Sequence, residues 1–136
     1  VFERRADNLL ATLDRIALDI GSSTATIDKH IDENSGQIID FHADDIFYGV
    51  KGQAYGYYML LKSLYQDYEG LIKERGLINA WNQMLASLKS VIDLDPFIVV
   101  NAAPDSQLLP NHLTAQGFYV LRARAQLQEI SNILLK

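Results

Sequence analysis

The feature that most constrains this fold is a recurrence of apolar side chains at every seventh position. One such row lies within residues 44–75 and another within residues 111–135. The two rows consist of Phe47, Ala54, Leu61 and Tyr68, and of Leu113, Val120, Leu127 and Leu134. A row of this period lies along one side of an α-helix, and the apolar side of another helix must cover it. The pattern predicts an all-α bundle of about four to five helices.

The first forty residues contain two predicted helices. Apolar residues spaced three and four apart mark one helical face in residues 2–20, namely Leu9, Leu13, Ile16 and Ile20. The cluster Gly21-Ser22-Ser23-Thr24 is rich in residues that disfavour helices, so we expect the first helix to end there. We expect a second, short helix over residues 25–33.

The strongest predicted element is one long helix over residues 44–75, which carries six tyrosines. Gly49, Gly52 and Gly56 lie near one line of this helix, on the side away from its apolar rows. Each glycine costs about 1 kcal/mol relative to alanine in a helix interior. We therefore expect another helix backbone to approach closely at these three glycines, which makes the long helix the centre of the bundle.

The rest of the chain continues the helical pattern with one interruption. Gly76 suits the left-handed position that ends the long helix. A third helix is predicted over residues 78–94, with Trp81 in the core. Residues 97–110 break the pattern, so we expect a buried extended connection there before the last helix at residues 111–135.

Charge and composition exclude several classes of protein. The chain has 12 basic and 17 acidic residues, a formal net charge of −5, and no cysteine. Residues 28–45 carry six acidic residues against Lys29, which equals the net charge of the whole chain. Because the basic residues are dispersed, nucleic-acid binding is not expected. The lack of cysteine excludes disulfides and thiolate metal sites.

The chain has the properties expected of one soluble domain over residues 1–136. No run approaches the roughly 18 apolar residues of a membrane span, and no signal peptide is recognisable. The chain begins at Val1, without an initiator methionine and within a predicted helix. We therefore expect it to be a fragment of a longer protein.

The acidic start of the long helix is the best candidate for chemistry. His42, Asp44 and Asp45 lie there, and folding could bring His112 near them. Imidazole and carboxylate groups can bind a divalent metal or act as a general base, which leaves a metal-dependent hydrolase open. Their spacing matches no established ligand motif, so an acidic helix start is the simpler interpretation. Arg124 lies close enough to the apolar stripe to pair with Asp44 or Asp45.

The tyrosines give the long helix aromatic surface on more than one side. Tyr48 and Tyr55, together with Lys51, could line a small-ligand site between helices, as in a sensor-like bundle. Half-exposed tyrosines also suit protein interfaces. No nucleophile elbow, phosphate loop or metalloprotease motif occurs, so we expect neither enzymatic activity nor a cofactor.

Several short motifs resemble one known family. They are Asp40-Phe41, Asp44-Asp45-Ile46-Phe47-Tyr48, Gly52-Gln53-Ala54-Tyr55, Asp95-Pro96-Phe97-Ile98-Val99-Val100-Asn101, Asn111-His112-Leu113 and Ala123-Arg124. Over about residues 40 to 135 the chain resembles an uncharacterised proteobacterial family catalogued as domain of unknown function 2333. The resemblance implies one N-terminal membrane helix followed by a largely helical region on the periplasmic side of the inner membrane. It implies no activity.

Three functional hypotheses follow. The leading one is a non-enzymatic helical domain, anchored to the envelope membrane outside this fragment, that binds a protein partner or supports an assembly, a homo-oligomer included. The second is a helical bundle that binds a small ligand at Tyr48, Lys51 and Tyr55. The third is a metal-dependent hydrolase that uses His42, Asp44 and His112.

Overall fold

A computed structural model describes the chain in three stretches, residues 2–34, 41–94 and 108–136, with side chains described for residues 5–27, 29, 46–94 and 114–136. It contains the helices α1 (Phe2–Asn34), α2 (Phe41–Asp67), α3 (Glu69–Glu74), α4 (Ile78–Asp93) and α6 (Leu108–Leu135). No strand occurs within these stretches. The prediction of an all-α bundle is confirmed.

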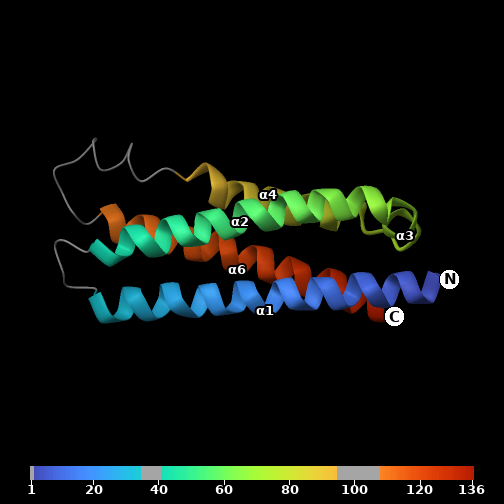
Figure 1. Ribbon diagram of the computed structural model, residues 1–136, viewed down its shortest axis with the longest axis horizontal. Helices are drawn as coiled ribbons and strands as arrows, with labels where there is room; N and C mark the ends of the chain where they lie inside the picture. Colours follow the sequence, from blue (N-terminus) through green and yellow to red (C-terminus); the bar gives the residue numbers. More distant parts are fainter. Residues whose placement is uncertain (1, 35–40, 95–107) are drawn as a thin grey trace.

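The four long helices lie side by side and alternate in direction (Figure 1). Because α3 turns the chain between α2 and α4, and α6 returns along α1, both termini lie at the same end of the bundle. α6 packs extensively against α1 and α4, and α2 packs against α4. α1 and α2 touch far less, so the seam between them is the least closed side of the bundle.

One apolar core runs along the bundle, and the predicted rows face it. Its members on these rows include Leu9, Leu13, Ile16, Ile20, Phe47, Ala54, Leu61, Val120, Leu127 and Leu134. Trp81 is fully buried among them, and its indole Nε1 donates a hydrogen bond to the carbonyl oxygen of Leu61 at 3.2 Å. The core positions predicted for these side chains are confirmed.

α1 continues through the cluster where the sequence predicts its end. Ser23, Thr24 and Thr26 each donate a side-chain hydrogen bond to the backbone carbonyl four residues earlier, at 3.0 to 3.3 Å. Gly21 packs against α6, where a Cβ would lie 3.1 Å from the Nε of Arg124. The predicted break is therefore wrong, because packing between helices outweighs the weak local preference of these residues.

The long helix predicted over residues 44–75 is divided. α2 ends at Asp67, and a turn at Tyr68 leads into the short helix α3. Gly76 has a φ of 68° after this helix, which confirms its predicted left-handed conformation. The extended connection predicted for residues 97–110 lies outside the described residues as far as 107. Residues 108–110 are helical, so the prediction is wrong there and the last helix begins earlier than expected, at Leu108.

The glycines of α2 do not mark a helix crossing. Gly49, Gly52 and Gly56 are exposed, and a Cβ built on any of them meets no atom within 4 Å among the described residues. α2 therefore occupies a corner of the bundle and not its centre. The predicted crossing is wrong because the glycines lie opposite the apolar rows of the same helix. Once those rows face the core, the glycines face outward.

Replacing Gly52 with alanine should stabilise the chain by about 0.5 to 1 kcal/mol. The position is helical and exposed, so alanine reduces the entropy of the unfolded chain without a steric cost. Urea unfolding measures the effect, with Gly76→Ala as the opposite control, because a φ of 68° strains any residue with a Cβ. A loss of more than about 1 kcal/mol in Gly52→Ala would show that a helix packs there after all.

Truncating Trp81 to alanine should destabilise the chain by about 3 to 5 kcal/mol, because it removes a fully buried indole and leaves a cavity. Thermal and urea unfolding measure the loss. Tyr55→Ala, on the exposed outer side of α2, should change the free energy of unfolding by less than about 0.5 kcal/mol. Equal effects of the two substitutions would remove Trp81 from the core.

Candidate functional site

The structure separates the three residues predicted to line a ligand site. Tyr48 and Tyr55 point outward from α2, with exposed fractions of 53% and 56%. The Nζ of Lys51 instead donates a hydrogen bond to the carbonyl oxygen of Leu94 at 2.9 Å, just after α4 ends. The last carbonyls of a helix carry partial negative charge, which a lysine ammonium stabilises. Lys51 therefore joins α2 to α4 and forms no common site with the tyrosines.

Arg124 lies in the interface between α1 and α6, where its guanidinium packs over Gly21. Its Nε is buried and has no hydrogen-bond partner among the residues whose side chains are described. The side chains of Asp44 and Asp45 lie outside the described residues, so their predicted ion pair with Arg124 stays a prediction. The structure does not bring Arg124 to the tyrosines of α2.

The predicted metal ligands also lie outside the described side chains. In the described backbone, His42 and Asp44 belong to the first turn of α2 and Asp45 begins its second turn. His112 likewise begins the second turn of α6. Across the residues with described side chains, no group of three or more histidine, aspartate or glutamate residues could hold a metal ion. The metal hypothesis stays a prediction.

The outward side of α2 is unusually apolar for a surface helix. Met59 and Leu60 are 47% and 42% exposed, next to the two exposed tyrosines. The three exposed glycines lie on the same outward side of α2 as these large side chains. Because glycine has no side chain, the helix backbone is accessible at these three positions. We name this surface the α2 outer face, made up of Tyr48, Gly49, Gly52, Tyr55, Gly56, Met59 and Leu60.

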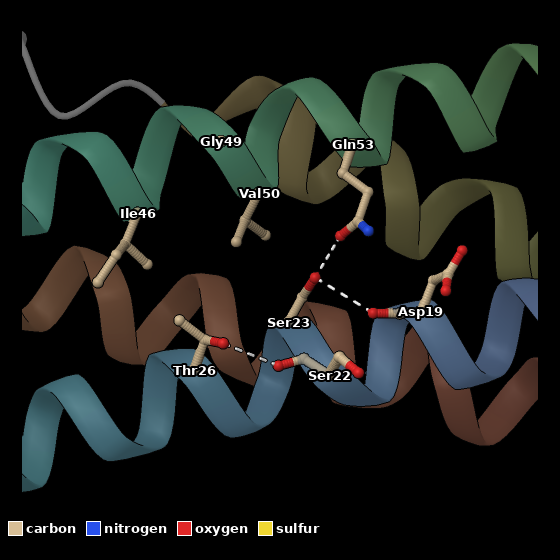
Figure 2. Close-up of a pocket in the computed structure, with 8 residues that line it drawn as sticks. All are labelled: Asp19, Ser22, Ser23, Thr26, Ile46, Gly49, Val50 and Gln53. Carbon is tan, nitrogen blue, oxygen red and sulfur yellow. Dashed lines mark hydrogen bonds between the residues drawn. The ribbon is translucent and has the colours of Figure 1, made fainter.

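A pocket of about 350 Å³ opens in the seam between α1 and α2 (Figure 2). The α1 wall is polar and the α2 wall is mainly apolar, so the two sides differ in chemistry. We name it the α1–α2 pocket, lined by Asp19, Ser22, Ser23 and Thr26 of α1 and by Ile46, Gly49, Val50 and Gln53 of α2.

Polar side chains join the two helices at one end of this pocket. The Ser23 hydroxyl hydrogen-bonds to the Gln53 side chain across the seam, as Figure 2 shows. Beyond it, the Tyr57 hydroxyl donates to Asp19 Oδ2 at 2.6 Å. The Nε of Arg15 lies 3.7 Å from Asp19 Oδ1, on the exposed side. This network replaces the apolar packing that closes the other seams.

The hydrogen bond between Tyr57 and Asp19 fixes the position of a proton. Burial raises the pKa of Tyr57 to about 12, and the hydrogen bond and charge of Asp19 add to the rise. Tyr57 therefore stays protonated across the physiological range and donates to the carboxylate. The Asp19 carboxylate has further acceptor positions besides the one that Tyr57 occupies.

The residue pattern contains a partial signal for this site that the predicted helix boundary obscured. Thr12, Asp19 and Thr26 recur every seven residues beside the apolar row of α1. A polar row in that register marks the edge of a helix interface. Because the first helix was predicted to end at residues 21–24, Thr26 was assigned to a different helix from Thr12 and Asp19. The partners of this row on α2, Gln53 and Tyr57, could therefore not be inferred.

Comparison with known proteins gives one match. A family model described as "Uncharacterized protein conserved in bacteria (DUF2333)" matches residues 6–136. The chain belongs to the DUF2333 family. The match extends the resemblance seen over about residues 40 to 135 into nearly all of α1, so the DUF2333 domain includes both walls of the pocket. No curated protein and no solved structure matches the chain.

In the described parts of this DUF2333 domain, no helix combines the length and the apolar character that crossing a bilayer requires. The exposed side chains and the pocket make the α2 outer face and the α1–α2 pocket the candidate sites of the DUF2333 domain.

Raising the pH above 10 should destabilise the DUF2333 domain through Tyr57. The pKa of this phenol is about 12 in the folded chain, against 10.0 for an ordinary tyrosine, so the folded state holds the proton more tightly. The resulting stabilisation is complete below pH 10 and is lost as the pH rises toward 12. Urea unfolding between pH 8.5 and 11.5 should show wild type losing stability relative to Tyr57→Phe.

The Asp19→Asn variant is the control for this pH dependence. It removes the negative charge but keeps an oxygen that can accept the phenol hydrogen, so the same comparison with Tyr57→Phe should give a weaker pH dependence. A stability difference between wild type and Tyr57→Phe that stays constant up to pH 11.5 would contradict the assigned hydrogen bond.

Proposed function

We propose that this DUF2333 domain is a non-enzymatic interaction domain of the bacterial envelope that binds a helix of a partner protein on the α2 outer face. The observation that carries the proposal is the exposure of Tyr48, Tyr55 and Met59 along this one helix. Exposed apolar side chains that gather on one surface mark interaction sites, whereas scattered ones do not. Tyrosine and methionine are also enriched where proteins bind each other.

The glycines of the same face support a helical partner. Glycine has no side chain, so a second helix can approach the α2 backbone closely at Gly52 and Gly56. Each glycine in a helix interior is unfavourable by about 1 kcal/mol relative to alanine, and no neighbour among the described residues compensates that cost. A partner helix that packs against these positions would supply the missing contacts.

The tyrosines would act as anchors beside this shallow path. Tyr48 and Tyr55 are seven residues apart and follow the same side of α2. Tyrosine offers a large contact surface and loses little side-chain entropy when it is ordered. A partner helix would therefore pack along the glycines with the two phenol rings at its side.

The location of the domain is a further part of the proposal. The family resemblance suggests that a membrane helix outside this sequence holds the domain at the inner membrane, facing the periplasm. The non-enzymatic role rests on the lack of a catalytic motif in the sequence, and the same reasoning proposes no cofactor and no nucleic-acid partner.

Photo-crosslinking in living bacteria tests the proposal with the full-length protein. A photoreactive phenylalanine derivative at position 48 or 55 should give a covalent adduct with the same partner protein, because both rings lie on the proposed interface. Mass spectrometry of the adduct should locate the link in a predicted helix of the partner. A link between two copies of this chain would identify the partner as a second copy.

Leu18 provides the matched control position, since it is 65% exposed on α1. The photoreactive residue at position 18 should give no such adduct, and Tyr55→Asp should abolish the adduct formed from position 48. If positions 48 and 55 give no adduct, or if position 18 gives the same one, the α2 outer face is not the interface.

A further inference from the structure

The α1–α2 pocket has the dimensions and chemistry of a small-molecule site that is distinct from the proposed interface. Its volume of about 350 Å³ falls at the lower end of the range of known ligand sites. All eight lining residues have described side chains. The polar residues of the lining lie mainly on α1, and the α2 wall opposite is mainly apolar apart from Gln53 (Figure 2). This combination can orient a small amphipathic molecule.

The charge of the pocket indicates the charge of its ligand. Asp19 is the only ionisable residue among the eight that line the pocket. Its Oδ2 accepts one hydrogen bond from Tyr57, and a carboxylate oxygen can accept more than one. Arg15 approaches Oδ1 only at 3.7 Å, and its side chain is 76% exposed, so water weakens this ion pair. A cation in the pocket could therefore pair with Asp19.

The other residues that line the pocket indicate which kind of cation would fit it. Ser22 and Ser23 offer hydroxyl oxygens on the same wall of the pocket as Asp19, and these suit the several N–H donors of an ammonium group. Ile46 and Val50 offer only aliphatic surface on the opposite wall. A ligand that matches both walls has an ammonium head and a short alkyl body.

The sequence around the pocket adds a second electrostatic argument. α1 and α2 both lead from the pocket into residues 28–45, which carry six acidic residues and Lys29. A segment with this net negative charge raises the local concentration of cations and lowers that of anions. It therefore favours a positively charged ligand for the neighbouring pocket.

We propose that the α1–α2 pocket binds a small organic cation, a primary ammonium with a short alkyl chain, and that Asp19 is its counter-ion. This proposal does not rest on the partner interface proposed above, although the two surfaces share Gly49. The probe is n-butylammonium, and its uncharged counterpart is 1-butanol, which has nearly the same size and alkyl chain. Amide chemical shifts in NMR titrations of the folded chain report both the affinity and the location of binding.

Binding of n-butylammonium should shift amides of residues around positions 19–26 and 46–53, and 1-butanol should bind at least tenfold more weakly. Asp19→Asn should reduce the affinity for n-butylammonium by at least tenfold. Asp14→Asn is the matched control, since Asp14 is exposed on the same helix, outside the pocket lining, and its loss changes the net charge equally. It should change the affinity by less than twofold.

A second pair of variants tests the location without removing charge. Gly49 lines the pocket and Gly56 does not, yet a Cβ at either position meets no described atom within 4 Å. Both Gly49→Leu and Gly56→Leu should therefore fold, but only Gly49→Leu should obstruct the pocket and weaken n-butylammonium binding.

Three results would overturn the proposal: no shifts at 20 mM n-butylammonium, equal binding of 1-butanol, or unchanged affinity in Asp19→Asn. None of them bears on the α2 outer face, because the crosslinks from positions 48 and 55 do not require the pocket. Conversely, Tyr55→Asp, which should abolish the adduct formed from position 48, should leave n-butylammonium binding unchanged.

Discussion

The burial of seven-residue apolar rows in one shared core determines the rest of this structure. A helix with its apolar residues on one side must turn its opposite side outward once that row is covered. In α2 the buried row contains Phe47, Ala54 and Leu61, so the line of Gly52 and Gly56 faces away from the bundle. The apolar surface proposed for partner binding is thus a direct consequence of how the core forms. Its composition is unexpected, because an outward side of this kind is usually polar.

The weak seam between α1 and α2 follows from how α2 is held. The buried Gln116 of α6 donates a hydrogen bond from Nε2 to the carbonyl oxygen of Phe47 at 2.8 Å, and Lys51 reaches the end of α4. These contacts position α2 from the sides of α6 and α4. At the interface with α1, polar groups such as Asp19 and Tyr57 meet instead of aliphatic side chains. Contacts of this kind depend on the distance and direction of hydrogen bonds more than on close packing. The α1–α2 pocket lies where these conditions coincide.

A feature of this structure could be predicted from the sequence when it depends on the residues of one helix. It could not be predicted when it depends on how two helices pack against each other. The apolar rows, the buried Trp81 and the left-handed Gly76 were predictable, because each depends on the pattern within one segment. The continuation of α1 past Gly21 was not, because it depends on the packing of α1 against α6, where the Arg124 side chain lies over Gly21. The pocket was not predictable for the same reason. Its residues meet only when the register between α1 and α2 is fixed, and no pattern within either helix specifies that register.

The two proposed sites share one residue, and this makes them physically connected. Gly49 belongs to the α2 outer face and also lines the α1–α2 pocket. A partner helix packed along the glycines would therefore cover part of the pocket opening or shift α2 relative to α1, the neighbour that it contacts least among the long helices it packs against. If the partner changes the affinity for a cation, the cation must change the affinity for the partner by the same factor. The seam between α1 and α2 is where such an effect would act, because α2 packs much less closely against α1 than against α4.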